Sequence, residues 1–250
     1  MMRLLIAFLF CLSLATPAWA GSSRDFDGVS DTSDYANPSG LTVGTDSFTA
    51  LIWVYWTQGA DTADETIISQ QDGTGTGRTW LSIDDDGASC GTGDEIYSFL
   101  GGACTDTATV MVQNTWTLLG VMSDEAAGAV NVFQDGVTIG SESKTVDAAT
   151  GLIRVGARKT GTTEDFEGQL ADFSLCEQAT SITYINEARF IFEIAVAATC
   201  GTGVYYIYSP LYGLNSPEDD ISGNGATGTL TGTTESFNGP PISAGGMMIL

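Results

Sequence analysis

Turn-forming residues punctuate this chain at intervals of roughly eight to twelve residues, and short runs of Val, Ile, Thr and aromatic residues lie between them. That spacing is typical of a β-sandwich or β-barrel and limits each element to a short strand. The run at 48–56 (FTALIWVYW) is apolar at nearly every position. We therefore expect a strand that is covered on both faces, with Trp53 on one side and Trp56 on the other.

Two other segments carry clear local patterns. Residues 130–141 (VNVFQDGVTIGS) are predicted to form a hairpin whose tight turn is Asp135-Gly136. Residues 181–198 (SITYINEARFIFEIAVAA) contain no Gly or Pro and carry apolar side chains at three-residue steps. This recurrence predicts one helix over about 181–198, followed by a strand at 204–208 (VYYIY).

The first twenty residues are predicted to be a secretory signal. One basic residue, Arg3, precedes an apolar run over 4–14, and Ala18-Trp19-Ala20 forms a small-x-small cleavage site. The run is too short to span a membrane, and we expect no span elsewhere. Cleavage near Ala20 would leave a secreted, extracellular or cell-surface protein.

The chain is strongly acidic, with 31 Asp and Glu against 8 Lys and Arg, no His, and a formal net charge of −23. A field of this sign repels nucleic acid and anionic lipid, so we expect no nucleic-acid partner. The carboxylates can serve solubility alone. Alternatively, some of them can hold calcium, which takes oxygen ligands.

Four cysteines remain after the signal is removed with Cys11, and in an exported protein they predict two disulfides. Three connectivities are possible. We favour Cys90–Cys104, which flank one predicted strand, and Cys176–Cys200, which flank the predicted helix. Zinc is less well supported, because the chain has no Cys-x-x-Cys pair and no histidine.

Six segments carry a family resemblance by their order along the chain. They are 26–36 (FDGVSDTSDYA), 48–56, 114–124 (NTWTLLGVMSD), 132–141, 153–158 (IRVGAR) and 166–179 (FEGQLADFSLCEQA). In this order they resemble the laminin-G-like jelly rolls of the concanavalin A-like lectin and glucanase superfamily. The resemblance covers roughly residues 26–179, although Thr117 stands where the family often has histidine and the first segment is two residues longer. It implies an all-β jelly-roll sandwich of two antiparallel sheets.

The resemblance also concerns the tail. In the family, segments resembling 204–211 (VYYIYSPL) and 220–230 (DISGNGATGTL) come before the FDG strand, whereas here they come after the predicted helix. We therefore expect the tail to pack back and complete the sandwich over about 204–232, with 204–208 and 227–230 as paired strands. The result is a single domain over 21–245, followed by a frayed end at 246–250.

Catalysis finds little support in the sequence. A retaining glycosidase needs two carboxylates about 5 to 5.5 Å apart, and family enzymes carry them as Glu-x-Asp-x-Glu on one strand. Here Glu164 and Glu167 have a spacing that puts them on opposite faces of a strand. The lack of histidine excludes a Ser-His-Asp hydrolase. We expect no enzyme and keep a glycosidase as the least supported alternative.

Sugar binding fits the chain better. Flat aromatic faces and short polar side chains bind sugar rings, and Trp80, Tyr97 and Phe99 fall, by resemblance, on the concave sheet. Core packing is the alternative for Trp80 and Tyr97, and it is the expected role of Trp53 and Trp116. We expect a carbohydrate or surface glycoconjugate as ligand. The alternative is an adhesive or structural surface protein that binds other proteins.

Calcium is the expected cofactor if one is present, as a structural ion. The resemblance implies Asp172 as a ligand, and Asp220 and Asn224 offer further oxygen donors if the tail folds back. The alternative is that Asp220 and Asn224 cap turns through side-chain to backbone hydrogen bonds.

Overall fold

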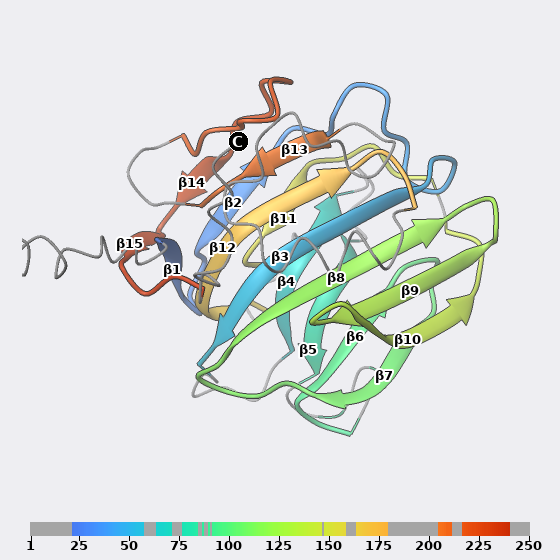
Figure 1. Ribbon diagram of the computed structural model, residues 1–250, viewed down its shortest axis with the longest axis horizontal. Helices are drawn as coiled ribbons and strands as arrows, with labels where there is room; N and C mark the ends of the chain where they lie inside the picture. The colour runs from blue at the N-terminus through green and yellow to red at the C-terminus, as the bar shows by residue number, and fades with distance from the viewer. Residues whose placement is uncertain are drawn as a thin grey trace, which may run out of the picture.

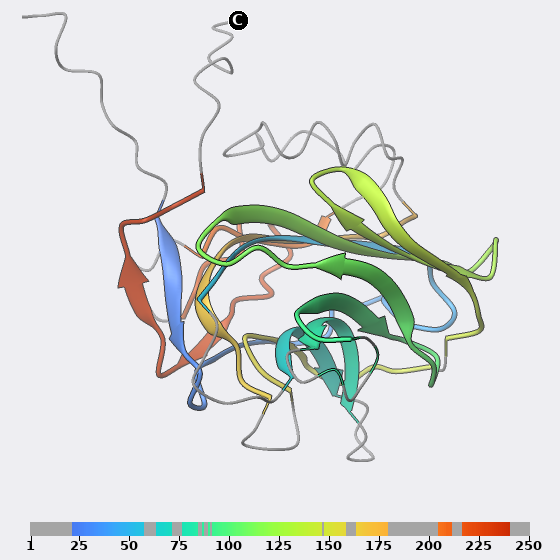
Figure 2. The same ribbon diagram turned by 90° about the horizontal axis from the view of Figure 1, so that it is seen from below.

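The computed structural model describes residues 22–57, 64–71, 77–84, 87, 90, 92–146, 148–158, 164–179, 205–211 and 217–240. Within these ranges the chain forms fifteen β-strands and no helix, and the strands make two antiparallel sheets packed face to face (Figure 1 and Figure 2). The predicted all-β jelly-roll sandwich is confirmed. The signal at 1–20, the helix at 181–198 and the frayed end at 246–250 lie outside the described residues.

Sheet A is the eight-stranded layer, in front in Figure 1. Its order is β10 (Val137–Ser143), β9 (Ala129–Gln134), β8 (Trp116–Asp124), β3 (Phe48–Trp56), β12 (Glu167–Cys176), β1 (Ser23–Asp27) and β15 (Thr234–Ser236), and β13 (Tyr205–Ser209) also pairs with β12.

Sheet B is the seven-stranded layer behind it. Its order is β14 (Thr229–Thr231), β2 (Thr32–Tyr35), β11 (Ile153–Val155), β4 (Glu65–Gln71), β5 (Gly77–Asp84), β6 (Glu95–Phe99) and β7 (Thr105–Val110).

The core lies between the sheets and is rich in aromatic rings. Phe48 of β3 packs on Trp80 of β5 with ring centroids 4.6 Å apart, and Tyr35 of β2 packs on Phe173 of β12 at 5.3 Å. Each such side chain stabilises the fold by about 1.5–3 kcal/mol through burial alone. The alternation expected in 48–56 is present. Trp56 is fully buried in the core, whereas Trp53 is half-buried in a smaller cluster on the outer face of sheet A.

One edge of β12 is shared by two strands from opposite ends of the chain. Its first half, Glu167 to Leu170, pairs with β1, and its second half, Phe173 to Cys176, pairs with β13. Between the halves lies a bulge in which Asp172 takes a left-handed φ of 52° and donates its N–H to the Pro210 carbonyl at 3.0 Å. Strand β13 therefore continues the line of β1, and neither strand covers the edge alone.

The tail completes the sandwich as expected, since β14 pairs with β2 in sheet B and β15 pairs with β1 in sheet A. Figure 2 shows β1 and β15 side by side at one margin. The predicted pairing of 204–208 with 227–230 is wrong, because β13 and β14 lie in opposite sheets. The segment between them crosses from one layer to the other, held by the mutual backbone bonds of Glu218 and Gly228 at 2.8 and 2.9 Å.

Local turn chemistry agrees with the sequence. Asp135 and Gly136 close the β9–β10 hairpin with φ of 49° and 78°, the left-handed pair that a two-residue type I′ turn requires. No helix in the described part of the chain is long and apolar enough to cross a membrane.

A buried ion pair joins the two ends of the described chain. Arg24 of β1 donates from Nη2 and Nε to Oε2 of Glu218 at 3.0 and 3.2 Å, and the side chains are only 6% and 4% exposed. Loss of one partner of a buried pair costs far more than the pair contributes, because it leaves an uncompensated charge away from water.

Replacement of Glu218 by Gln should therefore lower the free energy of unfolding by about 3–5 kcal/mol. For a domain of this size that loss corresponds to a fall in Tm of about 6–20 °C, measured by differential scanning calorimetry. Glu142→Gln, an exposed position on β10, is the matched control and should leave Tm nearly unchanged. Equal Tm values for the two variants would show that the pair does not hold the tail.

Candidate functional site

A pocket of about 300 Å³, here called the Tyr206 pocket, opens where three distant segments meet. The loop after β2, the residue directly after β12, and β13 with the loop before β14 each contribute side chains. The lining residues are Pro38, Ser39, Gly40, Glu177, Tyr206, Asn224 and Ala226.

The first wall is a tight loop anchored in the core. Leu41 and Val43 are buried, and the side-chain amide of Asn37 donates to the Leu41 carbonyl at 2.7 Å. Gly40 has a φ of 99°, which side chains rarely tolerate, and a Cβ built there would meet nothing within 4 Å. Glycine is thus required by the turn, not by the space in the pocket.

The opposite wall is held by the carboxylate of Asp220. Its Oδ1 accepts the N–H groups of Tyr208 and Ser222, both at 3.0 Å. Its Oδ2 accepts the Ser222 hydroxyl at 2.8 Å and the Ala226 N–H at 2.9 Å. One side chain therefore ties the loop to β13 and presents Asn224 and Ala226 to the pocket.

Tyr206 forms the floor. The side chain is 6% exposed, and its hydroxyl donates to the Gly40 carbonyl at 3.3 Å. Burial raises the pKa of Tyr206 to about 12, and the carboxylates of Glu177 and Asp46 act in the same direction. The phenol is therefore protonated at neutral pH and remains a hydrogen-bond donor. The pocket thus combines an aromatic ring, a phenol, a carboxylate, an amide and a hydroxyl.

The predicted sugar-binding aromatics do not form a surface together. Trp80 has no exposed surface and packs on Phe48, so a sugar ring cannot stack on it; its role is core packing. Tyr97 is 4% exposed, and its hydroxyl donates to Asp64 Oδ2 at 2.9 Å. Burial raises the pKa of Tyr97 above its ordinary value. Phe99 alone among the three is exposed, at 38%.

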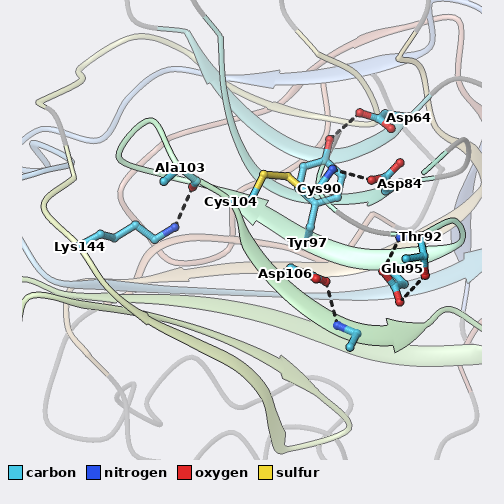
Figure 3. The surroundings of a disulfide bond; sticks show 11 residues. Asp64, Asp84, Cys90, Thr92, Glu95, Tyr97, Ala103, Cys104, Asp106 and Lys144 are labelled. Carbon is cyan, nitrogen blue, oxygen red and sulfur yellow. Dashed lines mark hydrogen bonds between the residues drawn. A yellow bond between two sulfur atoms is a disulfide. The ribbon is translucent and has the colours of Figure 1, made fainter. Parts of the chain in front are cut away.

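Tyr97 lies close to the disulfide Cys90–Cys104, whose Cα atoms are 5.7 Å apart (Figure 3). Two of the carboxylates drawn there accept backbone N–H groups: Asp84 accepts the Cys90 N–H at 2.6 Å, and Glu95 accepts the Thr92 N–H at 2.7 Å. Figure 3 also shows Lys144 donating to the Ala103 carbonyl, at 2.9 Å. These groups stabilise the loops around the disulfide.

The predicted Cys90–Cys104 bond is thus confirmed. Cys176 is buried at the end of β12 and takes part in a disulfide. Its expected partner, Cys200, lies outside the described residues, so the pairing Cys176–Cys200 stays a prediction.

The candidate calcium ligands are Asp172, Asp220 and Asn224. Asp220 does not fit a cation, because four N–H and O–H donors already occupy its two oxygens. Its hydrogen bonds agree with the alternative that Asp220 caps a turn. Asn224 lines the Tyr206 pocket, whereas Asp172 sits at the β12 bulge. Among the described residues no group of three or more His, Cys, Asp or Glu is placed to hold a metal ion.

The sequence did not single out Ser39, Glu177 or Tyr206. Tyr206 alternates with neighbours in an apolar strand, and Glu177 follows a buried strand end, so local patterns assign both to ordinary packing. Only the crossing of the tail over the sandwich brings them together.

Comparisons with known proteins agree with the fold. A laminin G family model described as the concanavalin A-like lectin/glucanases superfamily matches residues 30–186. A crystal structure from Bacteroides ovatus, of a protein proposed to bind carbohydrate, is 17% identical with a TM-score of 0.71 and covers 89% of this chain. This chain spans 61% of that protein.

A serum-amyloid-P-like pentraxin from Limulus polyphemus is 10% identical with a TM-score of 0.50, over 85% of this chain and 96% of its own. The extracellular region of zebrafish Gpr126 is 16% identical with a TM-score of 0.50, over 87% of this chain and 26% of its own. Such identities show a shared fold alone. No curated protein sequence matches the chain.

Replacement of Asp220 by Asn tests the pocket wall. The new amide can accept two bonds at Oδ1, but its NH₂ cannot accept from Ser222 Oγ and Ala226 N–H. Two charge-assisted bonds are lost, so the free energy of unfolding should fall by about 2–4 kcal/mol in urea denaturation. Asp219→Asn, exposed and one residue away, should change it by less than about 0.5 kcal/mol. Equal effects of the two changes would contradict this assignment.

Proposed function

The chain belongs to the concanavalin A-like lectin/glucanase superfamily, and we propose that it binds carbohydrate in the Tyr206 pocket. The observation that carries the proposal is the lining of this pocket: an aromatic ring beside a carboxylate, an amide and a hydroxyl in a space of about 300 Å³. Small-molecule sites join apolar or aromatic walls to a few placed polar groups, and this volume is at their lower end. It suits one terminal sugar unit.

Each lining group has a matching role toward a sugar. The carboxylate of Glu177 can accept hydrogen bonds from two adjacent hydroxyls, and such charged bonds are about twice as strong as neutral ones. The amide of Asn224 and the hydroxyl of Ser39 can donate or accept, which suits the mixed character of sugar hydroxyls. Shared fold with the Bacteroides ovatus protein, itself proposed to bind carbohydrate, gives further support.

We propose binding without catalysis. Among the described residues, the lining of the Tyr206 pocket has one carboxylate, Glu177. A retaining glycosidase needs a second carboxylate about 5 to 5.5 Å from the first, and an inverting one needs a partner about 6.5 to 9.5 Å away. Incubation with the bound glycan should release no reducing ends. Steady release that is lost in Glu177→Gln would establish a glycosidase instead.

We further propose that the protein is exported, with residues 1–20 removed. The disulfide Cys90–Cys104 supports this proposal, because such bonds persist in oxidising compartments. Mass spectrometry of the exported protein should find Gly21 at its N-terminus.

A broad glycan array probed with the mature protein tests the function, with calcium in one arm and EDTA in the other. Binding in both arms supports the pocket without a metal. Binding only with calcium would support the calcium prediction at Asp172 or Asn224. Binding in neither arm would overturn the proposal and favour the adhesive alternative, for which Phe237, 76% exposed beside the edge strand β15, is the first residue to change.

Ser39→Trp tests the location. Ser39 is exposed at the mouth of the Tyr206 pocket, so an indole there should obstruct it without disturbing the core. We expect glycan affinity to fall at least about tenfold by calorimetry, which is about 1.4 kcal/mol, while Tm stays unchanged. Ser141→Trp, exposed on β10 at the other side of sheet A, should bind normally. Normal binding by Ser39→Trp would place the ligand elsewhere.

A further inference from the structure

We propose that the Tyr206 pocket selects sugars that carry a free amino group and rejects sugars that carry a carboxylate. The inference rests on the proposed function and adds the chemical class of the ligand. It follows from the charges of the described residues at the pocket, which are negative.

The described lining of the pocket carries one negative charge, that of Glu177, and no positive charge. Glu177 stands directly after the buried Cys176, and its exposed side chain lines the pocket. No Lys or Arg is among the lining residues that the structure describes. A ligand that supplies a positive charge can therefore provide the countercharge that the described lining lacks.

The basic side chains described by the structure are engaged elsewhere. Arg24 pairs with Glu218, Arg154 with Asp34, and Arg158 with Glu164. Lys144 donates to the Ala103 carbonyl. None of these partners lines the pocket. An anionic sugar would thus meet Glu177 without any described cation to neutralise it.

A second carboxylate adds to the same field. Asp46 lies in the loop between β2 and β3, where its Oδ2 accepts the Thr42 N–H at 2.7 Å. Both Asp46 and Glu177 raise the pKa of the Tyr206 phenol, so both carboxylates act on the floor of the pocket.

Hydrogen-bond chemistry favours the same ligand class. An ammonium group offers three donors, and a carboxylate accepts them with charge assistance. A sugar carboxylate would instead place a like charge beside Glu177, which costs affinity. Because Glu177 is exposed, each charge should change affinity only modestly, by about three- to fivefold.

The test compares four β-1,4-linked glucose-series tetrasaccharides by calorimetry at pH 6 and low salt: 2-amino, 2-acetamido, unmodified and 6-carboxylate. The matching galactose series is run beside it. We expect the amino sugar to bind about threefold more tightly than the unmodified sugar, and the carboxylate at least about tenfold more weakly than the amino sugar. Raising the salt to about 0.5 M should reduce both ratios.

Glu177→Gln and Glu142→Gln are the matched variants, since each removes one negative charge from an exposed position. Glu177→Gln should bring the amino and unmodified sugars within about twofold of each other. Glu142→Gln should preserve the ratio. Unchanged selectivity in both variants, or equal binding of amino and unmodified sugars by the parent protein, would overturn the charge selection while leaving carbohydrate binding intact.

Two other outcomes are distinct. If no glycan of either series or of the broad array binds, the proposed function itself fails. If the carboxylate sugar binds best and only with calcium, a metal bridge replaces the charge selection and overturns it.

Discussion

The shared edge of β12 is the constraint on which the rest of the structure depends. On one side β12 pairs with β3 along almost its whole length, and on the other it needs both β1 and β13. The bulge at Asp172 marks the place where one strand gives way to the next. A sandwich with either strand missing would leave half of a central strand unpaired and expose backbone groups that must be hydrogen-bonded when buried. Closure therefore requires both ends of the chain, and the buried Arg24–Glu218 pair connects them at that margin.

The Tyr206 pocket is a consequence of this closure. The part that matches the family, residues 30–186, contains Ser39 and Glu177 but not Tyr206 or Asn224. The floor and one wall therefore come from the segment that lies outside the match. Because Asp220 ties that segment to β13, the geometry of the pocket and the stability of the sandwich edge are coupled. A ligand that binds only the closed form would in turn stabilise it.

Features that depend on neighbouring residues could be predicted from the sequence, and features that depend on distant contacts could not. The hairpin turn at Asp135-Gly136 and the Cys90–Cys104 bond were predicted because turn geometry and flanking positions are local properties. The return of the tail was predicted from family order, but its pairing was wrong, since nothing in 204–208 or 227–230 states which sheet each joins. Trp80 was assigned to a ligand site because the resemblance placed its strand on the concave sheet, but the resemblance did not state which face of the strand points inward, and register shifts in β4–β5 make that face hard to count. Tyr206 gave no signal, since its role depends on Gly40, which lies 166 positions away.

The acidic residues can affect a ligand in two ways: through the long-range field of the whole protein and through direct contact in the pocket. The two effects select ligands differently. The net charge of −23 repels any anionic partner at long range, but salt near 0.15 M limits such a field to about 8 Å. Glu177 acts on a bound ligand at contact, where screening is weaker. Repulsion by the whole surface would therefore slow the approach of acidic glycans, and this effect would weaken as salt is added. It would not depend on where an amino group sits on a sugar bound in the pocket. Selection by Glu177 depends on where the charge sits on the sugar, because only an amino group that reaches the carboxylate increases the affinity. The basic side chains that the structure describes pair with Asp34, Glu164, Glu218 and a backbone carbonyl, and none of them pairs with Glu177.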